Sequence, residues 1–179
     1  MRRLTEIRTE RLRMRRVRPD DLDAIHRIMS DPETMRFWSS PPHAMRVETE
    51  RWLDSMIEGD RTGQSDEFIL EHLGMVIGKL GAWRLPEIGF FLHRDCWGRG
   101  LATEALQRFI SYAAVRSVEY LTADVDPRNT ACLQLLAKCG FVETGRKSAT
   151  YVVAGQACDS VFLRCELQVP ARREKGRDQ

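Results

Sequence analysis

The segment with the most chemical information is His93–Ala105, which reads HRDCWGRGLATEA. It follows an extended run and leads directly into a strong helical pattern. Two glycines one residue apart, Gly98 and Gly100, let the backbone approach a ligand with no Cβ in the way. The first N–H groups of a helix lack internal partners and carry partial positive charge, so a phosphate or pyrophosphate fits there, with Arg99 adding charge. A tight strand-to-helix turn without a ligand is the alternative that two glycines alone leave open.

Two familiar phosphate-binding loops are excluded. The chain has no GxxxxGK[ST] motif, so it is not a P-loop NTPase. A dinucleotide-binding fold needs a third glycine where Thr103 stands, and it needs the motif after an early strand of a βαβ unit. Here the motif follows what the pattern predicts to be antiparallel strands.

Metal and disulfide chemistry is not indicated either. The cysteines are odd in number and form no CxxC pair, and the histidines form no HxxxH pair. We therefore expect no metal site and no disulfide framework. The residues concerned are Cys96, Cys132, Cys139, Cys158 and Cys165, with His26, His43, His72 and His93.

Composition indicates a globular, cytoplasmic protein. A chain of 179 residues suits one domain, and 42% hydrophobic with 30% charged residues argues against disorder. No apolar run approaches the roughly 18 residues of a membrane span, and the N-terminus lacks the apolar region of a secretory signal. We expect no association with a membrane.

Charge is distributed unevenly along the chain. The net charge is +2, but residues 1–18 carry +6, residues 170–179 carry +2 and the body between them carries −6. A nucleic-acid binder would usually have a basic body as well, so nucleic acid is not an expected partner. An acidic partner for the basic N-terminal arm, residues 1–8, is left open. The polar tail 170–179 is expected to be disordered.

The first third of the chain predicts a strand and three helices. Apolar residues alternate over Arg11–Val17, as in a half-buried strand. Acidic residues beside Pro19 and Pro32 mark two helix starts. The SSPPH loop at 39–43 then precedes a third helix, which is expected to continue to about Ile57.

The rest of the chain predicts a sheet with further helices. Short extended runs predict an antiparallel meander at Glu67–His72, Met75–Trp83 and Glu87–His93. Apolar residues at helical spacing from Ala102 to Ala113 predict a long helix. A strand at Tyr120–Asp126, a helix capped by Asn129 and ending at Cys139, and strands at Phe141–Val153 and Ser160–Leu167 complete the pattern. Helices on a mixed, mostly antiparallel sheet indicate an α/β (α+β) layered domain.

Several of these motifs, taken in order, resemble the GNAT N-acetyltransferases. Glu87–His93 followed by Trp97–Ala105 is similar to the acetyl-CoA-binding motif of that superfamily. The branch it resembles most is that of the ribosomal-protein-alanine and -serine N-terminal acetyltransferases. Thr9–Arg15, Asp31–Arg36 and Asn129–Phe141 match further family segments in the same order, which favours a ligand-binding turn over an empty one. The resemblance spans about residues 9–167, the expected N-acetyltransferase domain.

The resemblance implies a fold and a cofactor site. The fold is a GNAT-like mixed, mostly antiparallel central sheet with helices on both faces and a splay between the fourth and fifth strands, where acetyl-CoA lies. Backbone N–H groups of the glycine turn would hold the pyrophosphate, the strand at 91–93 would pair with the pantetheine arm, and Asn129 would contact that arm from the other side. The implied cofactor-binding residues are Phe91, Leu92, His93, Trp97, Gly98, Arg99, Gly100, Leu101, Ala102, Thr103 and Asn129.

Two residues are candidates for proton transfer. An amine must lose a proton to attack a thioester, and Glu87, at the start of the cofactor strand, is the best-placed base; the alternative is a surface strand residue. Cys132 replaces the serine of a family motif and could protonate the leaving thiolate, because its reference pKa is about 8.5. Its helical spacing from Leu135, Leu136 and Cys139 favours a core role instead. Leu136 stands where other branches have a tyrosine acid.

The expected activity is transfer of acetyl from acetyl-CoA to a primary amine. The favoured acceptor is a protein N-terminal α-amine; a polyamine, an aminoglycoside-like small amine, or a non-catalytic acyl-CoA-binding role are the alternatives. Trp38, beside Phe37, and Trp83 could line the acceptor pocket, and ordinary packing is the other interpretation. The protein is expected to act as a monomer or a homodimer.

Overall fold

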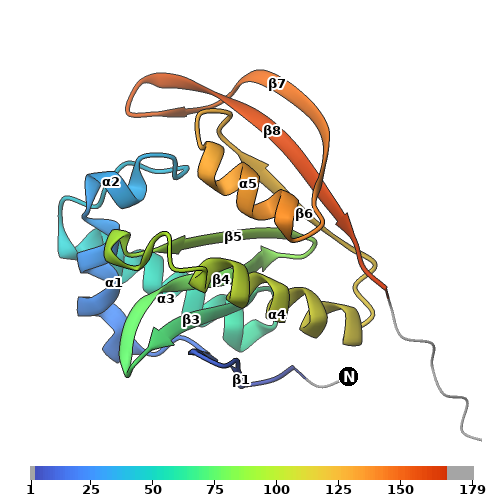
Figure 1. Ribbon diagram of the computed structural model, residues 1–179. Coiled ribbons are helices and arrows are strands. Elements are labelled where there is room, and N and C mark those ends of the chain that lie inside the picture. The colour runs from blue at the N-terminus through green and yellow to red at the C-terminus, as the bar shows by residue number, and fades with distance from the viewer. Residues whose placement is uncertain (1–2, 169–179) are drawn as a thin grey trace, which may run out of the picture.

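A mixed eight-stranded sheet forms the centre of the molecule (Figure 1). The computed structural model describes residues 3–168, and the tail expected at 170–179 lies outside them. The strand order is β1-β2-β3-β4-β5-β6-β8-β7, and every neighbouring pair is antiparallel except β5 and β6. The strands are β1 (Glu6–Arg8), β2 (Leu12–Arg15), β3 (Asp66–His72), β4 (Met75–Arg84), β5 (Glu87–Leu92), β6 (Tyr120–Val125), β7 (Val142–Val153) and β8 (Gln156–Glu166).

Helices cover both faces of the sheet, as predicted. In Figure 1 the long helix α4 crosses one face, and α1 and α3 lie behind the opposite face. The α-helices are α1 (Leu22–Met29), α2 (Pro32–Met35), α3 (Arg46–Thr62), α4 (Leu101–Val115) and α5 (Thr130–Lys138).

Alternation along the strands divides the core in two. On β3, Phe68 and Leu70 face the larger core with α4, whereas Ile69 faces the smaller core with α1, α2 and α3. Successive side chains of a strand point to opposite faces, so one apolar strand serves both cores. On β5, Leu92 belongs to the larger core and Phe91 to the smaller one.

The element boundaries differ from the sequence expectation in three places. A short strand, β1, lies within the basic arm and pairs with β2, although its residues show no apolar pattern. Helix α3 continues to Thr62, past the expected end near Ile57, which the sequence pattern missed because the last turn is polar. The helix stops at Gly63, which has the left-handed conformation that commonly ends helices. Strand β8 begins at Gln156 rather than Ser160.

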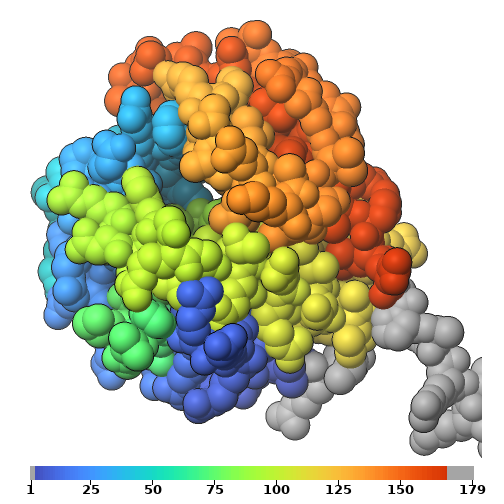
Figure 2. Space-filling model, in the orientation of Figure 1, coloured from blue at the N-terminus to red at the C-terminus, as the bar shows by residue number. Residues whose placement is uncertain are grey.

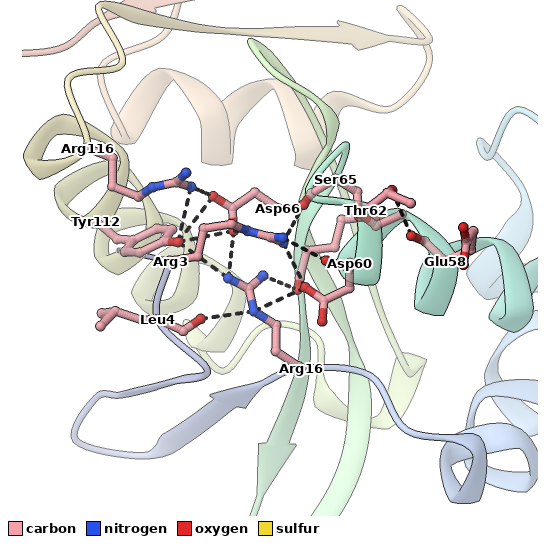
Figure 3. A network of polar contacts seen from close by, with 12 residues as sticks. Arg3, Leu4, Arg16, Glu58, Asp60, Thr62, Ser65, Asp66, Tyr112 and Arg116 are labelled. Carbon is pink, nitrogen blue, oxygen red and sulfur yellow. Dashed lines mark hydrogen bonds and ion pairs between the residues drawn. The ribbon is translucent and has the colours of Figure 1, made fainter. Parts of the chain in front are cut away.

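A network of charged residues joins the N-terminal arm to the sheet (Figure 3). Arg3, Arg16 and Arg116 all form ion pairs with the buried carboxylate of Asp66, at the start of β3. The Tyr112 hydroxyl of α4 also donates to Asp66, at 3.1 Å. These contacts fix the end of α4 against the central strands.

Within residues 3–168, none of the helices combines the length and the apolar composition that crossing a membrane requires.

Candidate active site

Strands β5 and β6 diverge soon after they meet. Their one register pair is Glu87 with Thr122, next to a hydrogen bond from the Thr122 N–H to the Pro86 carbonyl at 2.9 Å. This is the splay predicted between the fourth and fifth expected strands. Beyond it lies a cavity of about 510 Å³, here called the splay cavity, lined by β5, the turn before α4, α5 and the segment at 33–38. Figure 2 shows a hollow where the blue, lime and orange segments that contribute these residues meet.

The start of α4 presents free backbone N–H groups to this cavity. Gly98 and Gly100 have φ values of +68° and +74°, which L side chains rarely adopt, and a Cβ on Gly98 would meet nothing within 4 Å. Gly100 is the N-cap and has no side chain to bond the N–H groups of the first turn. The turn therefore offers unpaired donors and the positive end of a 15-residue helix to an anion.

Most of the predicted cofactor residues line the splay cavity. These are Phe91, Leu92, Trp97, Gly98, Gly100, Leu101, Ala102, Thr103 and Asn129. Asn129 also caps α5, as predicted, because its side-chain oxygen accepts the Cys132 N–H at 3.1 Å. The Asn129 amide nitrogen stays available to a ligand.

Two predicted cofactor residues, His93 and Arg99, do not line this cavity. The Arg99 guanidinium lies 3.3 Å from the His72 ring nitrogen, so its side chain is directed away from the cavity wall, and the expected contribution of its charge stays a prediction. The His93 ring accepts the Asp95 N–H at 3.3 Å, and the His93 N–H donates to Ile77 of β4. A short-range motif cannot show on which side of the turn such side chains lie.

The open edge of β5 is formed by Phe90 and Leu92. In a strand, the backbone groups of alternate residues face the same neighbouring strand. The His93 N–H faces β4, so the backbone groups of Phe90 and Leu92 face the splay. Trp97 Nε1 donates a hydrogen bond to the Leu92 carbonyl at 2.8 Å, so this carbonyl already has a partner. Pairing with the pantetheine arm was expected at residues 91–93. The backbone groups open for such pairing are instead the N–H and carbonyl of Phe90 and the N–H of Leu92.

Cys132 lies in the first turn of α5, lines the splay cavity and also packs against the larger core. Burial raises the pKa of this thiol to about 12. A thiol with so high a pKa is a poor proton donor to another thiolate, which has a reference pKa of about 8.5.

A second cavity, of about 770 Å³, adjoins the first and contains the other predicted residues. We call it the tryptophan cavity, because Trp38, Trp52 and Trp83 line it together with Glu87. Phe37 and Trp38 line both cavities and so form their common wall. Trp38 packs edge-on against Phe91, with ring centroids 5.1 Å apart, whereas Trp83 is 53% exposed.

The floor of the tryptophan cavity holds an ion pair that the sequence pattern did not identify. Lys79 Nζ lies 2.5 Å from a Glu67 carboxylate oxygen, and both residues are buried. Lys79 Nζ also lies 5.3 Å from the Trp38 ring centroid. A lysine at the centre of the apolar strand VIGKLGAW is the signal that could have revealed this pair.

Two further contributors come from distant strands. Asp124 of β6 and Tyr151 of β7 line the tryptophan cavity and were not predicted. Burial raises the pKa of Tyr151 to about 12, and the Asp126 charge adds to that rise. Among the described residues, no group of His, Cys, Asp or Glu is arranged to hold a metal ion.

The arrangement suits a two-substrate transfer. One cavity has a helix N-terminus for an anion, and the adjoining cavity has carboxylates and aromatic rings for a cation. Glu87 lies where β5 and β6 meet and is exposed to the tryptophan cavity. The chemistry available there is the removal of a proton from a bound cationic group.

Known proteins resemble this chain in sequence. A family profile described as "Acetyltransferase (GNAT) domain" matches residues 11–142. The uncharacterized N-acetyltransferase p20 of Bacillus licheniformis is 30% identical over 146 residues, which cover 76% of this chain and 82% of that protein.

Solved structures resemble it in fold. A ribosomal L7/L12 α-N-protein acetyltransferase in complex with coenzyme A superposes with a TM-score of 0.82 at 17% identity, covering 92% of this chain and 99% of its own. A spermidine N-acetyltransferase from Vibrio cholerae, solved with CoA and spermine, has a TM-score of 0.76 at 20% identity and covers 90% and 98%. These likenesses confirm the predicted fold class.

Proposed function

The chain belongs to the GNAT acetyltransferase family and is an acetyl-CoA-dependent N-acetyltransferase, and we propose that its acceptor is the α-amine of a protein N-terminus. The pair of adjoining cavities, one lined by free helix N–H groups and the other by Glu87, supports the transfer itself. The protein acceptor is supported by the resemblance of residues 87–105 to the ribosomal-protein N-terminal acetyltransferases. A small diffusible amine is the second candidate, because aromatic rings and carboxylates bind any cationic amine.

We assign acetyl-CoA to the splay cavity. Its pyrophosphate would accept hydrogen bonds from the N–H groups between Gly98 and Thr103, where the helix dipole favours negative charge. The open edge at Phe90 and Leu92 would pair with the pantetheine amides, and Asn129 would contact them from α5. When bound, acetyl-CoA supplies an activated thioester carbonyl.

We assign the base to Glu87. A protonated primary amine in the tryptophan cavity is not a nucleophile until it loses a proton, and Glu87 is positioned to accept that proton directly or through water. The acyl carbonyl carbon then gains the C–N bond and loses the C–S bond. The Trp38 wall between the cavities would hold water away from the thioester.

We assign Cys132 a packing role in the wall of the splay cavity. Its raised pKa makes donation to the departing thiolate unfavourable. The second proton that the nitrogen loses once the C–N bond has formed would pass to that thiolate instead. The alternative, in which Cys132 is the acid, predicts that serine at this position restores turnover that alanine loses.

The acceptor class is tested by identifying products. The protein would be incubated with acetyl-CoA, a peptide with a free N-terminus, the same peptide with a blocked N-terminus, and a panel of small amines. Mass spectrometry should find acetyl on the free α-amine and none on the blocked peptide. Acetylation confined to small amines would overturn the protein acceptor and leave the second candidate. The cytoplasmic location and the monomeric or homodimeric state remain predictions.

A further inference from the structure

Two carboxylates in the tryptophan cavity have no cationic partner among the described residues. Five charged residues line this cavity. Glu67 is paired with Lys79, and Glu58 with Arg61. The other two, Glu87 and Asp124, are exposed and form no ion pair in the described part of the chain. The cavity thus has two negative charges that protein groups do not neutralise.

These two carboxylates lie on the same side of the sheet, one on each side of the splay. Glu87 of β5 is in register with Thr122 of β6, and Asp124 is two residues further along β6. Residues two apart on a strand point to the same face, and the intervening Ala123 belongs to the larger core on the other face. Glu87 and Asp124 therefore face the acceptor together.

The cationic side chain opposite Glu87 in the strand register does not neutralise the two carboxylates. Arg84 is the cross-strand partner of Glu87, but its guanidinium lies over the Trp83 ring, 5.0 Å from the centroid, and Arg84 does not line the cavity. Arg128, near the other side of the cavity, forms a bidentate pair with Asp126. Within residues 3–168, neither arginine forms an ion pair with Asp124.

We propose that the acceptor amine carries a second positive charge and that Asp124 is the residue that binds it. This rests on the proposed function, in which the reacting amine gives its proton to Glu87. Glu87 matches the positive charge of the reacting amine, so a substrate with a single amine would leave the negative charge of Asp124 without a partner. Trp83 and Tyr151 line the same space and add aromatic surface for a cation. The substrate class is a primary amine with a second cationic nitrogen, either a diamine or a peptide N-terminus next to a basic residue.

The test compares amines that differ only in the second charge. Values of kcat/KM would be measured for butylamine and putrescine, and for a peptide with lysine or norleucine as its second residue. The wild type should prefer the charged member of at least one pair by about 10- to 100-fold, as expected for a charge-assisted hydrogen bond. The pair that shows the preference distinguishes a small diamine from a peptide.

Asp124→Asn should abolish this preference by lowering kcat/KM for the charged member to about that of the uncharged member. The control is Glu119→Gln, which removes an exposed carboxylate just before β6 that lines neither cavity. It should keep the preference. Equal use of both members by the wild type, or a preference that survives in Asp124→Asn, would overturn this proposal alone. Transfer to none of the amines would overturn the proposed function as well.

Discussion

Glu87 is the proposed base and would take the proton of the acceptor amine. Glu87→Gln keeps the shape and hydrogen-bonding capacity of the side chain but cannot accept a proton. We expect kcat to fall by about 10²- to 10⁴-fold, the usual contribution of general base catalysis, with acetyl-CoA affinity unchanged. Steady-state kinetics and calorimetric titration of acetyl-CoA measure the two quantities.

The split between turnover and stability separates this role from a structural one. Loss of a base should lower kcat and leave the melting temperature unchanged, whereas loss of a structural contact should lower the melting temperature as well. A Glu87→Gln enzyme with the wild-type rate would assign deprotonation to water or to an amine that binds in its neutral form.

Cys132 is expected to be an unreactive thiol. Burial raises its pKa to about 12, so the thiolate fraction is small at neutral pH and increases about tenfold per pH unit until that pKa is reached. Alkylation of Cys132, followed by mass spectrometry, should therefore be at least about 100-fold slower than that of a free cysteine at pH 8. Cys132→Ala should change turnover less than about threefold.

A different titration would reverse the assignment of Cys132. An alkylation rate that levels off between pH 8 and 9 would indicate a thiol with an ordinary pKa of about 8.5. Combined with turnover that serine restores and alanine does not, that result would make Cys132 the acid.

Among the elements, the N-terminus of α4 is the proposed site of the acetyl-CoA pyrophosphate. Gly100→Asp would add a carboxylate at the N-cap of α4, beside the turn assigned to the pyrophosphate, on a Cβ that would lie 3.5 Å from Arg11 Nη2. Gly100→Asn introduces the same shape at the same left-handed φ without the charge, and asparagine tolerates this conformation. We expect Gly100→Asp to bind acetyl-CoA at least about tenfold more weakly than Gly100→Asn, as measured by calorimetry.

Repulsion between the introduced carboxylate and the pyrophosphate is the expected cause of the weaker binding. The comparison of the two variants isolates it, because they differ only in charge. Equal affinities in two folded variants would remove the pyrophosphate from this turn. Glu104 of α4 anchors the turn independently, because its carboxylate accepts the Arg11 N–H at 2.9 Å and pairs with the Arg11 guanidinium at 2.6 Å.

The elements that sequence could predict are those with a continuous apolar period. The helical spacing in α4 recurs over many residues and β3 has an unbroken apolar run at its centre, so their predicted positions agree with the structure. The short strand β1 has a single buried residue, Ile7, and it forms because β2 offers a partner, which is a tertiary effect. The last turn of α3 is solvent-exposed and carries no apolar signal.

At the scale of the whole molecule, Asp66 is the carboxylate that links the N-terminal arm, the central sheet and α4 (Figure 3). Asp66→Asn would leave Arg3 and Arg16 with Asp60 as their remaining carboxylate partner, and Arg116 with none among the described residues. We expect the free energy of unfolding to fall by about 3–5 kcal/mol, as when one partner of a buried ion pair is removed. Denaturant titration measures it.

The matched control for Asp66 is an exposed ion pair. Asp23→Asn removes the partner of Arg46 at the surface, where solvent screening leaves such pairs with at most about 1 kcal/mol. If Asp66→Asn proves no more destabilising than Asp23→Asn, the network is not what holds the arm and α4 together.

The site as a whole was only partly predictable. The turn before α4 is contiguous in sequence, so its glycines and the cap at Asn129 could be recognised locally. Asp124 and Tyr151 lie on strands separated by a helix, and only the folded sheet brings them to one cavity. The side to which Arg99 turns depends on His72, which is distant in sequence.

The most direct test of the account is whether CoA release depends on an amine. At saturating acetyl-CoA, the free thiol released by the wild-type protein should rise with the concentration of a primary amine, and the amount of acetylated amine should equal the amount of thiol. Glu87→Gln should bind acetyl-CoA equally well and release thiol at a much lower rate. Tight binding of acetyl-CoA with no amine-dependent release of thiol across the peptide and small-amine panel would contradict the conclusion that the protein is an N-acetyltransferase.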